Sequence, residues 1–110
     1  MKYIPDQGDI VYFSFDPSSG KEIMKRRPAF VLSKRIFNDH TGFAVVAPIT
    51  STIRNIQLEV VLPDDMTTSG SVMVHQLKSL DFEDRKAKLI EATPLAITQK
   101  VLGIARAIIA

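Results

Sequence analysis

The chain carries the stretch IVYFSFDPSSGKEIMKRRPAFVLS at residues 10–33, in which two apolar runs flank a turn-rich, basic loop. The apolar runs, 10–15 and 29–32, are rich in β-branched and aromatic residues and are predicted to form strands. Between them, the Asp-Pro, Ser-Ser-Gly and Arg-Pro sequences end regular structure, so the loop is expected at the surface above a supporting sheet. One carboxylate, Glu22, lies there among four cations, Lys21, Lys25, Arg26 and Arg27. A charged loop on a rigid base suits a site that handles phosphate.

Length and composition limit the class of protein. The chain has 110 residues, of which 45% are hydrophobic. This is enough for one core, so residues 1–110 are predicted to form a single domain. No apolar run approaches the roughly 20 residues of a membrane span, and the N-terminal residues lack the apolar segment of a secretory signal. We therefore expect a cytoplasmic protein without a membrane partner.

The net charge of +2 is small, but the cations are unevenly distributed. Between Lys21 and Arg35 there are six cations and one acid, whereas acidic residues cluster at 64–65 and 81–84. One face should therefore carry a positive potential, although a solvated charged loop is the simpler interpretation of such a run. The chain has no cysteine, and its two histidines, His40 and His75, cannot by themselves form a zinc site. Chemistry without a metal or other cofactor is the default expectation.

Short apolar runs recur along the chain. Six of them are rich in β-branched or aromatic residues and are predicted as strands, at 10–15, 29–32, 43–48, 58–62, 71–75 and 88–92. Several short strands in one small domain favour a barrel. The runs around residues 30, 45 and 60 are almost continuously apolar, as expected where core or a partner covers both faces. The pattern favours a closed sheet that is able to dimerise.

The last segment has the clearest helical pattern. Thr93 is predicted to cap this helix and Pro94 to occupy its first position. An apolar stripe at helical spacing follows, formed by Val101, Leu102, Ala105, Ile108 and Ile109. The helix should pack against the barrel. Short helical turns are also predicted at 34–38 and at 81–86, where Asp81 can act as the cap.

Several short motifs occur in a fixed order along almost the whole chain. They are Pro5-Asp6-Gln7-Gly8-Asp9-Ile10-Val11, Phe15-Asp16-Pro17, Gly20-x-Glu22, Arg27-Pro28-Ala29-x-Val31-Leu32-Ser33, Pro48-Ile49-Thr50-Ser51, Glu59-Val60-Val61-Leu62 and Gln76-x-Lys78-Ser79. By the order and spacing of these motifs, the sequence resembles the MazF/PemK family, the toxins of bacterial toxin–antitoxin pairs.

That resemblance implies a mainly β (α+β) fold, a small SH3-like β-barrel with a C-terminal α-helix and short connecting helical turns. It implies a homodimer that cuts single-stranded RNA at short sequence motifs. It also implies a cognate antitoxin whose tail lies across the toxin and blocks RNA. Members of the family cut without a metal and leave a 2′,3′-cyclic phosphate and a 5′-hydroxyl.

Such cleavage needs a base for the ribose 2′-hydroxyl, a group that offsets charge on the phosphorane, and an acid for the departing 5′-oxygen. The resemblance assigns catalytic positions to Glu22, Arg27 and Thr50. Our hypothesis makes Glu22 the general base. Arg27 suits forked donation to the non-bridging phosphate oxygens, and Pro28 restricts the backbone that aims it. The Thr50 hydroxyl can bind phosphate, and Ser51 can add a second hydroxyl.

The other substrate-binding candidates surround this set. Cations suited to tracking the RNA backbone are Lys21, Lys25, Arg26, Lys78 and Arg54. Asn38 is a candidate contact to a base from its loop, and Gln76 belongs to the matched Gln-x-Lys-Ser motif. Together these residues predict an RNA-binding surface around the catalytic set.

Two departures from the family pattern affect the site. Many relatives follow Gly-x-Glu with Gln and Gly, whereas this chain has Ile23-Met24-Lys25-Arg26, a more basic loop with less glycine. Relatives often carry an acid just before the Gln of Gln-x-Lys-Ser, where this chain has His75. His75 can protonate the leaving group near neutral pH, since an unperturbed imidazole titrates at about pH 6.5. The alternative is a polar residue at a strand end that makes one hydrogen bond.

Two other functions fit the same fold. A relative of the gyrase poison CcdB would inhibit a topoisomerase, but those proteins are expected to carry a Trp-Gly-Ile tail and this chain has no tryptophan. The second alternative is a catalytically silent SH3-like module that binds peptide or RNA. His75 and Ile23 favour it, whereas the complete set of Glu22, Arg27 and Thr50 opposes it.

Overall fold

The first two strands form the pair predicted from residues 10–33. In the computed structural model, which describes residues 2–14 and 26–110, β1 (Asp9–Ser14) runs antiparallel to β2 (Arg26–Val31). Phe30 and Val31 point to opposite faces of the sheet, and both side chains are fully buried. Both faces are therefore covered here, as the continuous apolar run predicted.

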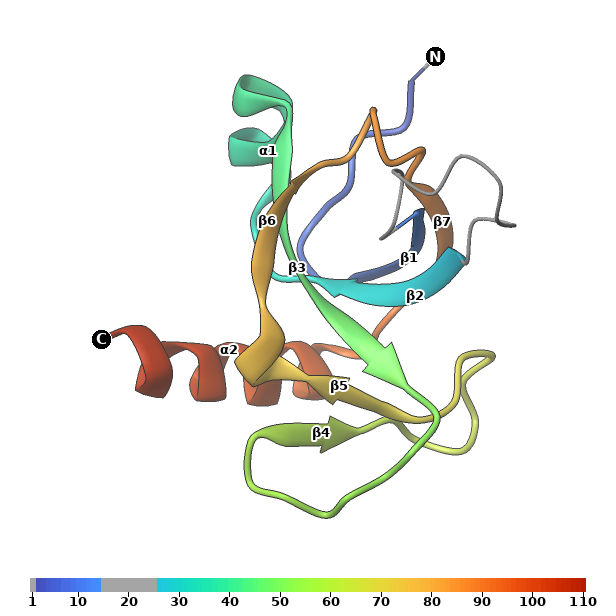
Figure 1. Ribbon diagram of the computed structural model, residues 1–110, viewed down its shortest axis with the longest axis vertical. Coiled ribbons are helices and arrows are strands. Elements are labelled where there is room, and N and C mark those ends of the chain that lie inside the picture. The colour runs from blue at the N-terminus through green and yellow to red at the C-terminus, as the bar shows by residue number, and fades with distance from the viewer. Residues whose placement is uncertain (1, 15–25) are drawn as a thin grey trace, which may run out of the picture.

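Strand β3 (Phe43–Thr50) lies at the centre of the sheet (Figure 1). One edge of β3 pairs with β2, and the other pairs first with β6 (Lys78–Asp81) and then with β5 (Ser71–Met73). Strand β4 (Glu59–Val61) extends the sheet beyond β5, and β7 (Lys88–Ala92) extends it beyond β1. The described strands form one antiparallel sheet in the order β4-β5-β3-β2-β1-β7, with β6 beside β3.

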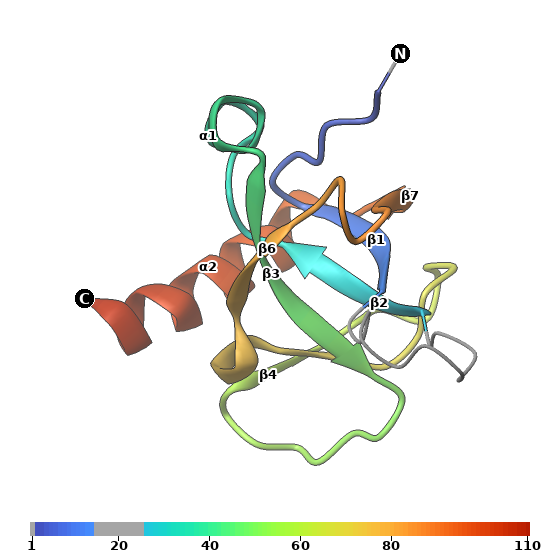
Figure 2. The same cartoon turned by 45° about the horizontal axis from the view of Figure 1, so that its top comes forward.

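The prediction of a mainly β protein with a C-terminal helix is confirmed. The sheet curves strongly, and β4 and β7 form its two ends in the described part of the chain. Helix α2 (Leu95–Ile109) lies across one side of it, as Figure 2 shows. The molecule thus consists of a curved sheet and one covering helix.

Two hydrophobic clusters hold these layers together. On one face of the sheet, Ile97, Val101 and Ala105 of α2 pack with Phe30 and Val72. A second cluster occupies the other face and draws on β1, β2, β3, β6 and the residue after β6, with the members Val11, Phe13, Ala29, Val31, Ala44, Val46, Leu80 and Phe82. Burial of this apolar area on both faces stabilises the curvature.

The start of α2 differs from the prediction. Pro94 has extended backbone angles, φ −59° and ψ 148°, so the helix begins at Leu95. Thr93 does not cap it, because its hydroxyl donates instead to the carbonyl oxygen of Gly8 at 2.9 Å. The predicted cap was therefore wrong, and Thr93 ties the C-terminal helix to the N-terminal segment.

The two shorter helical predictions had different outcomes. Helix α1 (Arg35–Thr41) is longer than the turn expected at 34–38 and ends at Gly42, whose left-handed φ of 78° suits glycine. Asp81 ends strand β6, and residues 82–86 form turns rather than a helix. The Asp81 carboxylate nevertheless caps this segment, because it accepts from the backbone N–H groups of Glu83 and Asp84.

One strand was missed, and two, predicted at 58–62 and 71–75, are shorter than expected. Strand β5 ends at Met73, after which the short 3-10 helix η1 (Val74–Gln76) leads into the unpredicted strand β6. The reason is topological: β5 and β6 pair with different parts of the same edge of β3, so the chain must bend between them.

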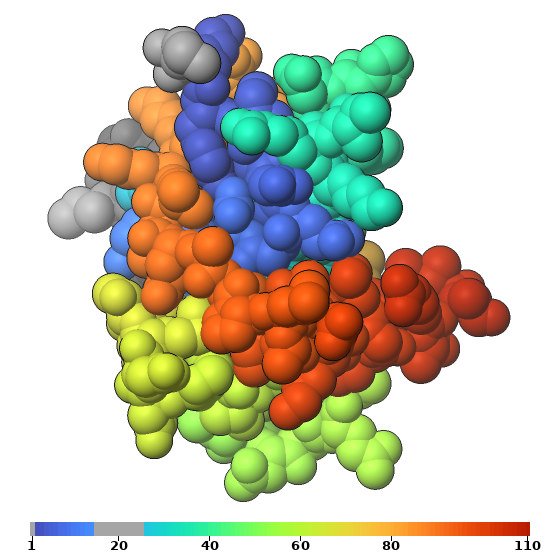
Figure 3. All heavy atoms as spheres, turned by 180° about the vertical axis from the view of Figure 1, so that it is seen from behind, coloured from blue at the N-terminus to red at the C-terminus, as the bar shows by residue number. Residues whose placement is uncertain are grey.

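Figure 3 shows the opposite side of the molecule, where α2 crosses the surface and its C-terminal half projects beyond its neighbours. Ile108 and Ile109 in that half are exposed at 46% and 72%. Within residues 2–14 and 26–110, the structure contains no helix of the length and hydropathy that a membrane span requires.

Candidate active site

Arg27 lies at the exposed start of β2, opposite Phe13 of β1. Side chains two residues apart on a strand share a face, so Arg27 projects from the same face as Ala29 and Val31. Those two residues belong to the buried cluster inside the curve. Arg27 therefore lies at the surface end of a row whose other side chains are buried and apolar, and its guanidinium is accessible.

Thr50 is the last residue of β3 and lies opposite Ser71 of β5. The β2–β3 register pairs Ala29 with Pro48, and the same register continued by two residues brings Arg27 and Thr50 to the same end and face of the pair. Figures 1 and 2 both show the start of β2 and the end of β3 on the same side of the molecule, which agrees with this placement.

A glycine makes room for the end of β3. Gly70 has a φ of 117°, and a Cβ at this position would lie 2.1 Å from the carbonyl oxygen of Thr50. No other residue type fits there without displacement of the backbone. The Thr50 hydroxyl oxygen accepts a hydrogen bond from the N–H of Thr52 at 3.1 Å, which leaves its proton available for donation to a phosphate oxygen.

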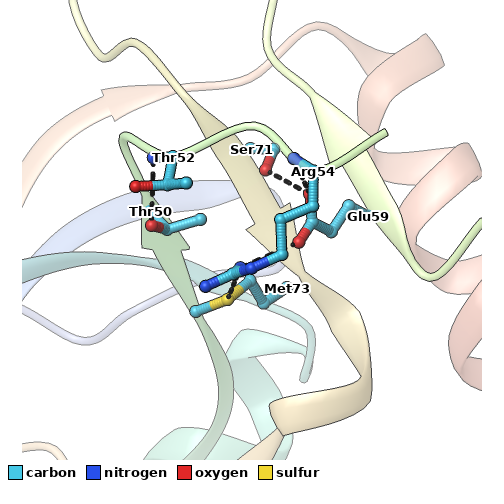
Figure 4. A network of polar contacts seen from close by, with 6 residues as sticks. All are labelled: Thr50, Thr52, Arg54, Glu59, Ser71 and Met73. Carbon is cyan, nitrogen blue, oxygen red and sulfur yellow. Dashed lines mark hydrogen bonds and ion pairs between the residues drawn. The ribbon is translucent and has the colours of Figure 1, made fainter. Parts of the chain in front are cut away.

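The loop after Thr50 is tied down by a buried carboxylate (Figure 4). Glu59 Oε1 accepts from the hydroxyl of Ser71 at 3.0 Å and from the N–H of Arg54 at 3.3 Å. Glu59 Oε2 accepts from Nη1 of Arg54 at 3.1 Å, and the same nitrogen lies 3.3 Å from the sulfur of Met73. The Glu59 side chain is only 1% exposed, whereas that of Arg54 is 50% exposed.

This network keeps Glu59 ionised. Burial alone would raise its pKa, but the hydrogen bonds from Ser71 and Arg54, together with the guanidinium charge, outweigh burial and lower the pKa. The carboxylate beneath the loop is therefore favoured in its ionised form, next to the guanidinium of Arg54.

The network and Thr50 share one face of the sheet. Ser71 lies opposite both Thr50 and Val61, and Met73 lies opposite Glu59. Directly opposed residues share a face, as do residues two apart along β5. The side chains of Thr50, Ser71, Met73 and Glu59 consequently project from the face that also carries Arg27.

The other predicted substrate-binding residues have different surroundings. Arg26 is exposed and partly engaged, because its Nη2 donates to the carbonyl oxygen of Lys86 at 2.7 Å. Ser51 is exposed next to Thr50. His75 and Gln76 are exposed in η1, and Lys78 pairs with Val46 on β3. Glu22, Lys21 and Lys25 lie outside the described residues.

Asn38 is a correction. Its side chain is fully buried, where Nδ2 donates to the carbonyl oxygens of Pro5 and Ser33 and Oδ1 accepts from the Ser33 hydroxyl. The prediction that Asn38 contacts a base is therefore wrong, because its polar groups face the interior and are used to hold α1.

Glu59, Ser71 and Gly70 were not among the residues predicted to form the site. A signal for Glu59 existed, since it is a charged residue inside the apolar run 58–62 and buried charges are paired. Its partners could not be found, because Arg54 precedes it by five residues and Ser71 follows it by twelve.

Fold and site together define a small antiparallel β protein whose arginine and hydroxyl groups suit a phosphodiester. Residues 6–109 match the model of a family described as the PemK-like, MazF-like toxin of type II toxin–antitoxin systems. The chain belongs to this family, as the resemblance implied.

Individual relatives agree with this assignment. The endoribonuclease toxin MazF of Escherichia coli K12 is 36% identical over 86 residues, which cover 78% of this chain and 77% of the relative. The endoribonuclease PemK of Escherichia coli is 32% identical over 102 residues, which cover 89% of this chain and 77% of the relative. The prediction of an endoribonuclease toxin is confirmed at the level of the family.

Solved structures share the fold. A chain of the MazE–MazF crystal structure (Form-II) from Deinococcus radiodurans has a TM-score of 0.90 and 34% identity, with coverage of 97% of this chain and 96% of that chain. MazF (Form-I) from the same organism has a TM-score of 0.87 at 34% identity, with coverage of 97% of both chains. The predicted fold class is confirmed by these structures.

Proposed function

We propose that this protein cleaves single-stranded RNA by attack of a ribose 2′-hydroxyl on the adjacent phosphorus, without a metal or cofactor. The products are a 2′,3′-cyclic phosphate and a 5′-hydroxyl. Cleavage of messenger RNA by this route would inhibit translation and growth, as befits a toxin. The observation that carries the proposal is the placement of Arg27 and Thr50 on one face at one end of the β2–β3 pair.

Each proposed group has a distinct chemical task. The 2′-hydroxyl proton passes to Glu22 as the bond from O2′ to phosphorus forms, and the bond from phosphorus to O5′ breaks. Arg27 donates two hydrogen bonds to the non-bridging oxygens, whose negative charge grows in the phosphorane. The Thr50 hydroxyl donates to the same phosphate. O5′ leaves with a proton from a general acid, for which His75 is the candidate.

The proposed unit of action is one toxin domain over residues 1–110, and RNA is its first partner. Basic side chains around the site, with Lys21, Lys25, Arg26 and Lys78 as candidates, would follow the RNA backbone. Ser51 and Gln76 are the polar candidates beside them. An RNA substrate places the site of action in the cytoplasm.

A cognate antitoxin is the second partner. Relatives from Deinococcus radiodurans were solved as MazE–MazF complexes. We infer that the antitoxin of this chain covers the face that carries Arg27 and Thr50, and so excludes RNA by occupying its site.

A second copy of the chain is the third partner, and a groove between β4 and α2 fits it. The groove encloses about 560 Å³ and is lined by Glu59, Val60, Val61, Lys100, Gly103, Ile104 and Ala107. Val61 is 48% exposed and lines this groove with residues from the C-terminal half of α2. A two-fold dimer would cover this apolar surface with the same surface of its partner.

The test is cleavage of a long transcript in the presence of EDTA. Wild type should cut it and leave 5′-hydroxyl ends, which polynucleotide kinase labels without prior phosphatase treatment. Arg27→Ala and Thr50→Val should each lower the single-turnover rate by roughly 100-fold, the usual effect of removing one donor to a developing oxyanion.

Arg35→Ala is the matched control, because Arg35 is an exposed arginine at the start of α1. Helix α1 precedes the eight-residue strand β3, and Thr50 lies at the far end of that strand. About 20 Å therefore separates Arg35 from Thr50. This variant should cleave like wild type. Undiminished cleavage by Arg27→Ala would remove the proposed site.

A further inference from the structure

The geometry points to Glu59 as a positioning residue for Thr50 in RNA cleavage, an inference that rests on the proposed function. Glu59 does not touch the substrate in this assignment. Its carboxylate holds the two chain segments that meet at Thr50, so that the hydroxyl presents its proton to the scissile phosphate.

One oxygen atom joins both segments. Glu59 Oε1 accepts from the hydroxyl of Ser71, the cross-strand partner of Thr50, and from the N–H of Arg54 in the loop that follows Thr50. Ser71 is fully buried, so its hydroxyl has a defined place in the interior. A shift of the Glu59 carboxylate would therefore move the strand beside Thr50 and the loop after it together.

The loop in turn holds the hydroxyl of Thr50. The N–H of Thr52 donates to Thr50 Oγ1 at 3.1 Å, and Thr52 lies between Thr50 and the clamped backbone of Arg54. Because this N–H occupies an acceptor position of the oxygen, the hydroxyl proton must point elsewhere. The chain of contacts thus runs from Glu59 through the Arg54 backbone to the orientation of the catalytic hydroxyl.

A buried charge at this place needs a reason. Burial of a carboxylate costs free energy that its partners only partly return, and an apolar residue would pack β4 as well. Oε1 accepts from both the Ser71 hydroxyl and the Arg54 N–H, contacts that no apolar side chain could make, while Oε2 pairs with the Arg54 guanidinium. These contacts are better explained by a role in fixing the loop after Thr50 than by a role in packing the core.

Four variants separate positioning from general bracing of the fold. Glu59→Ala removes the clamp, whereas Glu59→Gln retains Oε1 and loses only the charge that pairs with Arg54. Ser71→Ala removes one end of the clamp and keeps the carboxylate. Arg54→Gln removes the guanidinium and keeps the backbone N–H.

The rates are measured on a single-stranded RNA transcript at a temperature where circular dichroism shows each variant folded. Glu59→Ala should lower kcat by roughly 10- to 100-fold with KM nearly unchanged, since small misplacements of a catalytic group cost about this much. Ser71→Ala should show a smaller loss of the same kind. Glu59→Gln should retain most of the rate. Arg54→Gln should retain most of kcat but raise KM, because Arg54 is also a candidate contact to the RNA backbone.

A double-mutant comparison tests whether Glu59 acts through Thr50. In a Thr50→Val background, Glu59→Ala should lower kcat no further, because the hydroxyl that it positions is gone. In an Arg27→Lys background, Glu59→Ala should lower kcat by the full factor. A residue that only braces the fold would lower the rate equally in both backgrounds.

The outcomes are distinct from those that test the proposed function. If Thr50→Val and Arg27→Lys cleave like wild type, the proposed function fails. If both are impaired but Glu59→Ala is equally harmful in the two backgrounds, only the positioning role fails. A Glu59→Gln variant as slow as Glu59→Ala would also overturn the role of Oε1.

Discussion

Three polar side chains, of which Asn38 and Glu59 are buried, hold loops in place. Asn38 is fully buried and links α1 to the segment around Pro5, while Glu59 links the loop after Thr50 to β5. Glu91 on β7 does the same for a third loop, because it accepts from the N–H groups of Thr67 and Thr68. Such groups are costly to leave without partners, so each loop has one preferred position.

Asn38→Ala should destabilise the protein without affecting RNA. The change removes hydrogen bonds at 2.5–3.2 Å and leaves the buried carbonyl oxygen of Pro5 without its donor. We expect the free energy of unfolding to fall by about 2–4 kcal/mol, measured by urea denaturation. The Kd of the folded variant for a 2′-O-methyl RNA, which lacks the attacking hydroxyl, should equal that of wild type. Weaker RNA binding with unchanged stability would restore Asn38 as a base contact.

The carboxylate of Glu91 should make stability depend on pH. Burial alone would raise its pKa, but hydrogen bonds from the hydroxyl and N–H of Thr68 and from the N–H of Thr67 outweigh it and lower the pKa. A lowered pKa in the folded state stabilises the protein above about pH 4.5, the unfolded value, and this contribution is lost as pH falls toward the folded pKa.

Glu91→Gln should therefore reduce the loss of unfolding free energy below pH 4.5, measured by urea denaturation at a series of pH values. Part of the loss should remain, because Glu59 also has a lowered pKa and contributes in the same direction. If the two stability curves run parallel at low pH, the Thr67–Thr68 contacts do not stabilise the ionised form of Glu91.

At the scale of elements, β3 connects the two halves of the sheet. Its start pairs with β6, its middle with β2 and its end with β5, so the position of Thr50 depends on three neighbouring strands. The tightest of these approaches is at Gly70, just before β5. The element that carries the hydroxyl proposed for catalysis is consequently, among the described strands, the one with the most strand partners.

Gly70→Ala should displace the end of β3. Its Cβ would lie 2.1 Å from a backbone oxygen and its φ of 117° is unfavourable for alanine, so we expect a loss of about 2–4 kcal/mol in unfolding free energy. The single-turnover rate of RNA cleavage should fall as well, because Thr50 moves.

Gly42→Ala is the matched control for this change. Gly42 also has a positive φ, 78°, but nothing lies within 4 Å of a Cβ built there. Only the conformational strain of about 1 kcal/mol is then expected, with the cleavage rate unchanged. Equal effects of the two variants would show that the approach of Gly70 to Thr50 is unimportant.

At the scale of the whole molecule, the surface carries two separate features. The face with Arg27 and Thr50 is polar and suits RNA, whereas the groove between β4 and α2 is largely apolar and suits a second copy. Glu59 belongs to both regions, since it lines the groove and holds the loop after Thr50. A dimer formed at the groove would thus bury the outer side of β4, the strand whose Glu59 supports the candidate active site.

Gly103→Arg should dissociate the dimer without harm to the monomer. Nothing lies within 4 Å of a Cβ built at Gly103, so the fold accommodates the new side chain, and arginine favours a helix more than glycine does. The side chain would enter the groove and block a second copy. Sedimentation velocity should show a shift from dimer to monomer, with unchanged helical circular dichroism.

Ala96→Arg provides the control, because Ala96 is an exposed residue of the same helix and does not line the groove. It adds the same charge and should leave the dimer intact. A dimer that persists in Gly103→Arg would place the interface elsewhere.

Much of the fold follows from local patterns in the sequence. The alternating and continuous apolar runs predicted six of the seven described strands within a few residues, and the helical stripe predicted α2. Motif order indicated the family, whereas the roles that the resemblance assigns to Arg27 and Thr50 stay predictions. Strand β6 was missed because Lys78–Asp81 has few apolar residues and owes its conformation to pairing with β3.

Most of the elements, the family and the residue types available for catalysis were therefore readable from the chain alone, because these depend on neighbours along the chain. Only the tertiary structure decided that Asn38 is buried, that Gly70 approaches Thr50 and that Glu59 joins Arg54 to Ser71. Those contacts depend on strand register and on how segments distant in sequence pack together. Local periodicity in the sequence carries no information about strand register or about the packing of distant segments. A hydrogen bond between residues distant in sequence exists only once the sheet has formed.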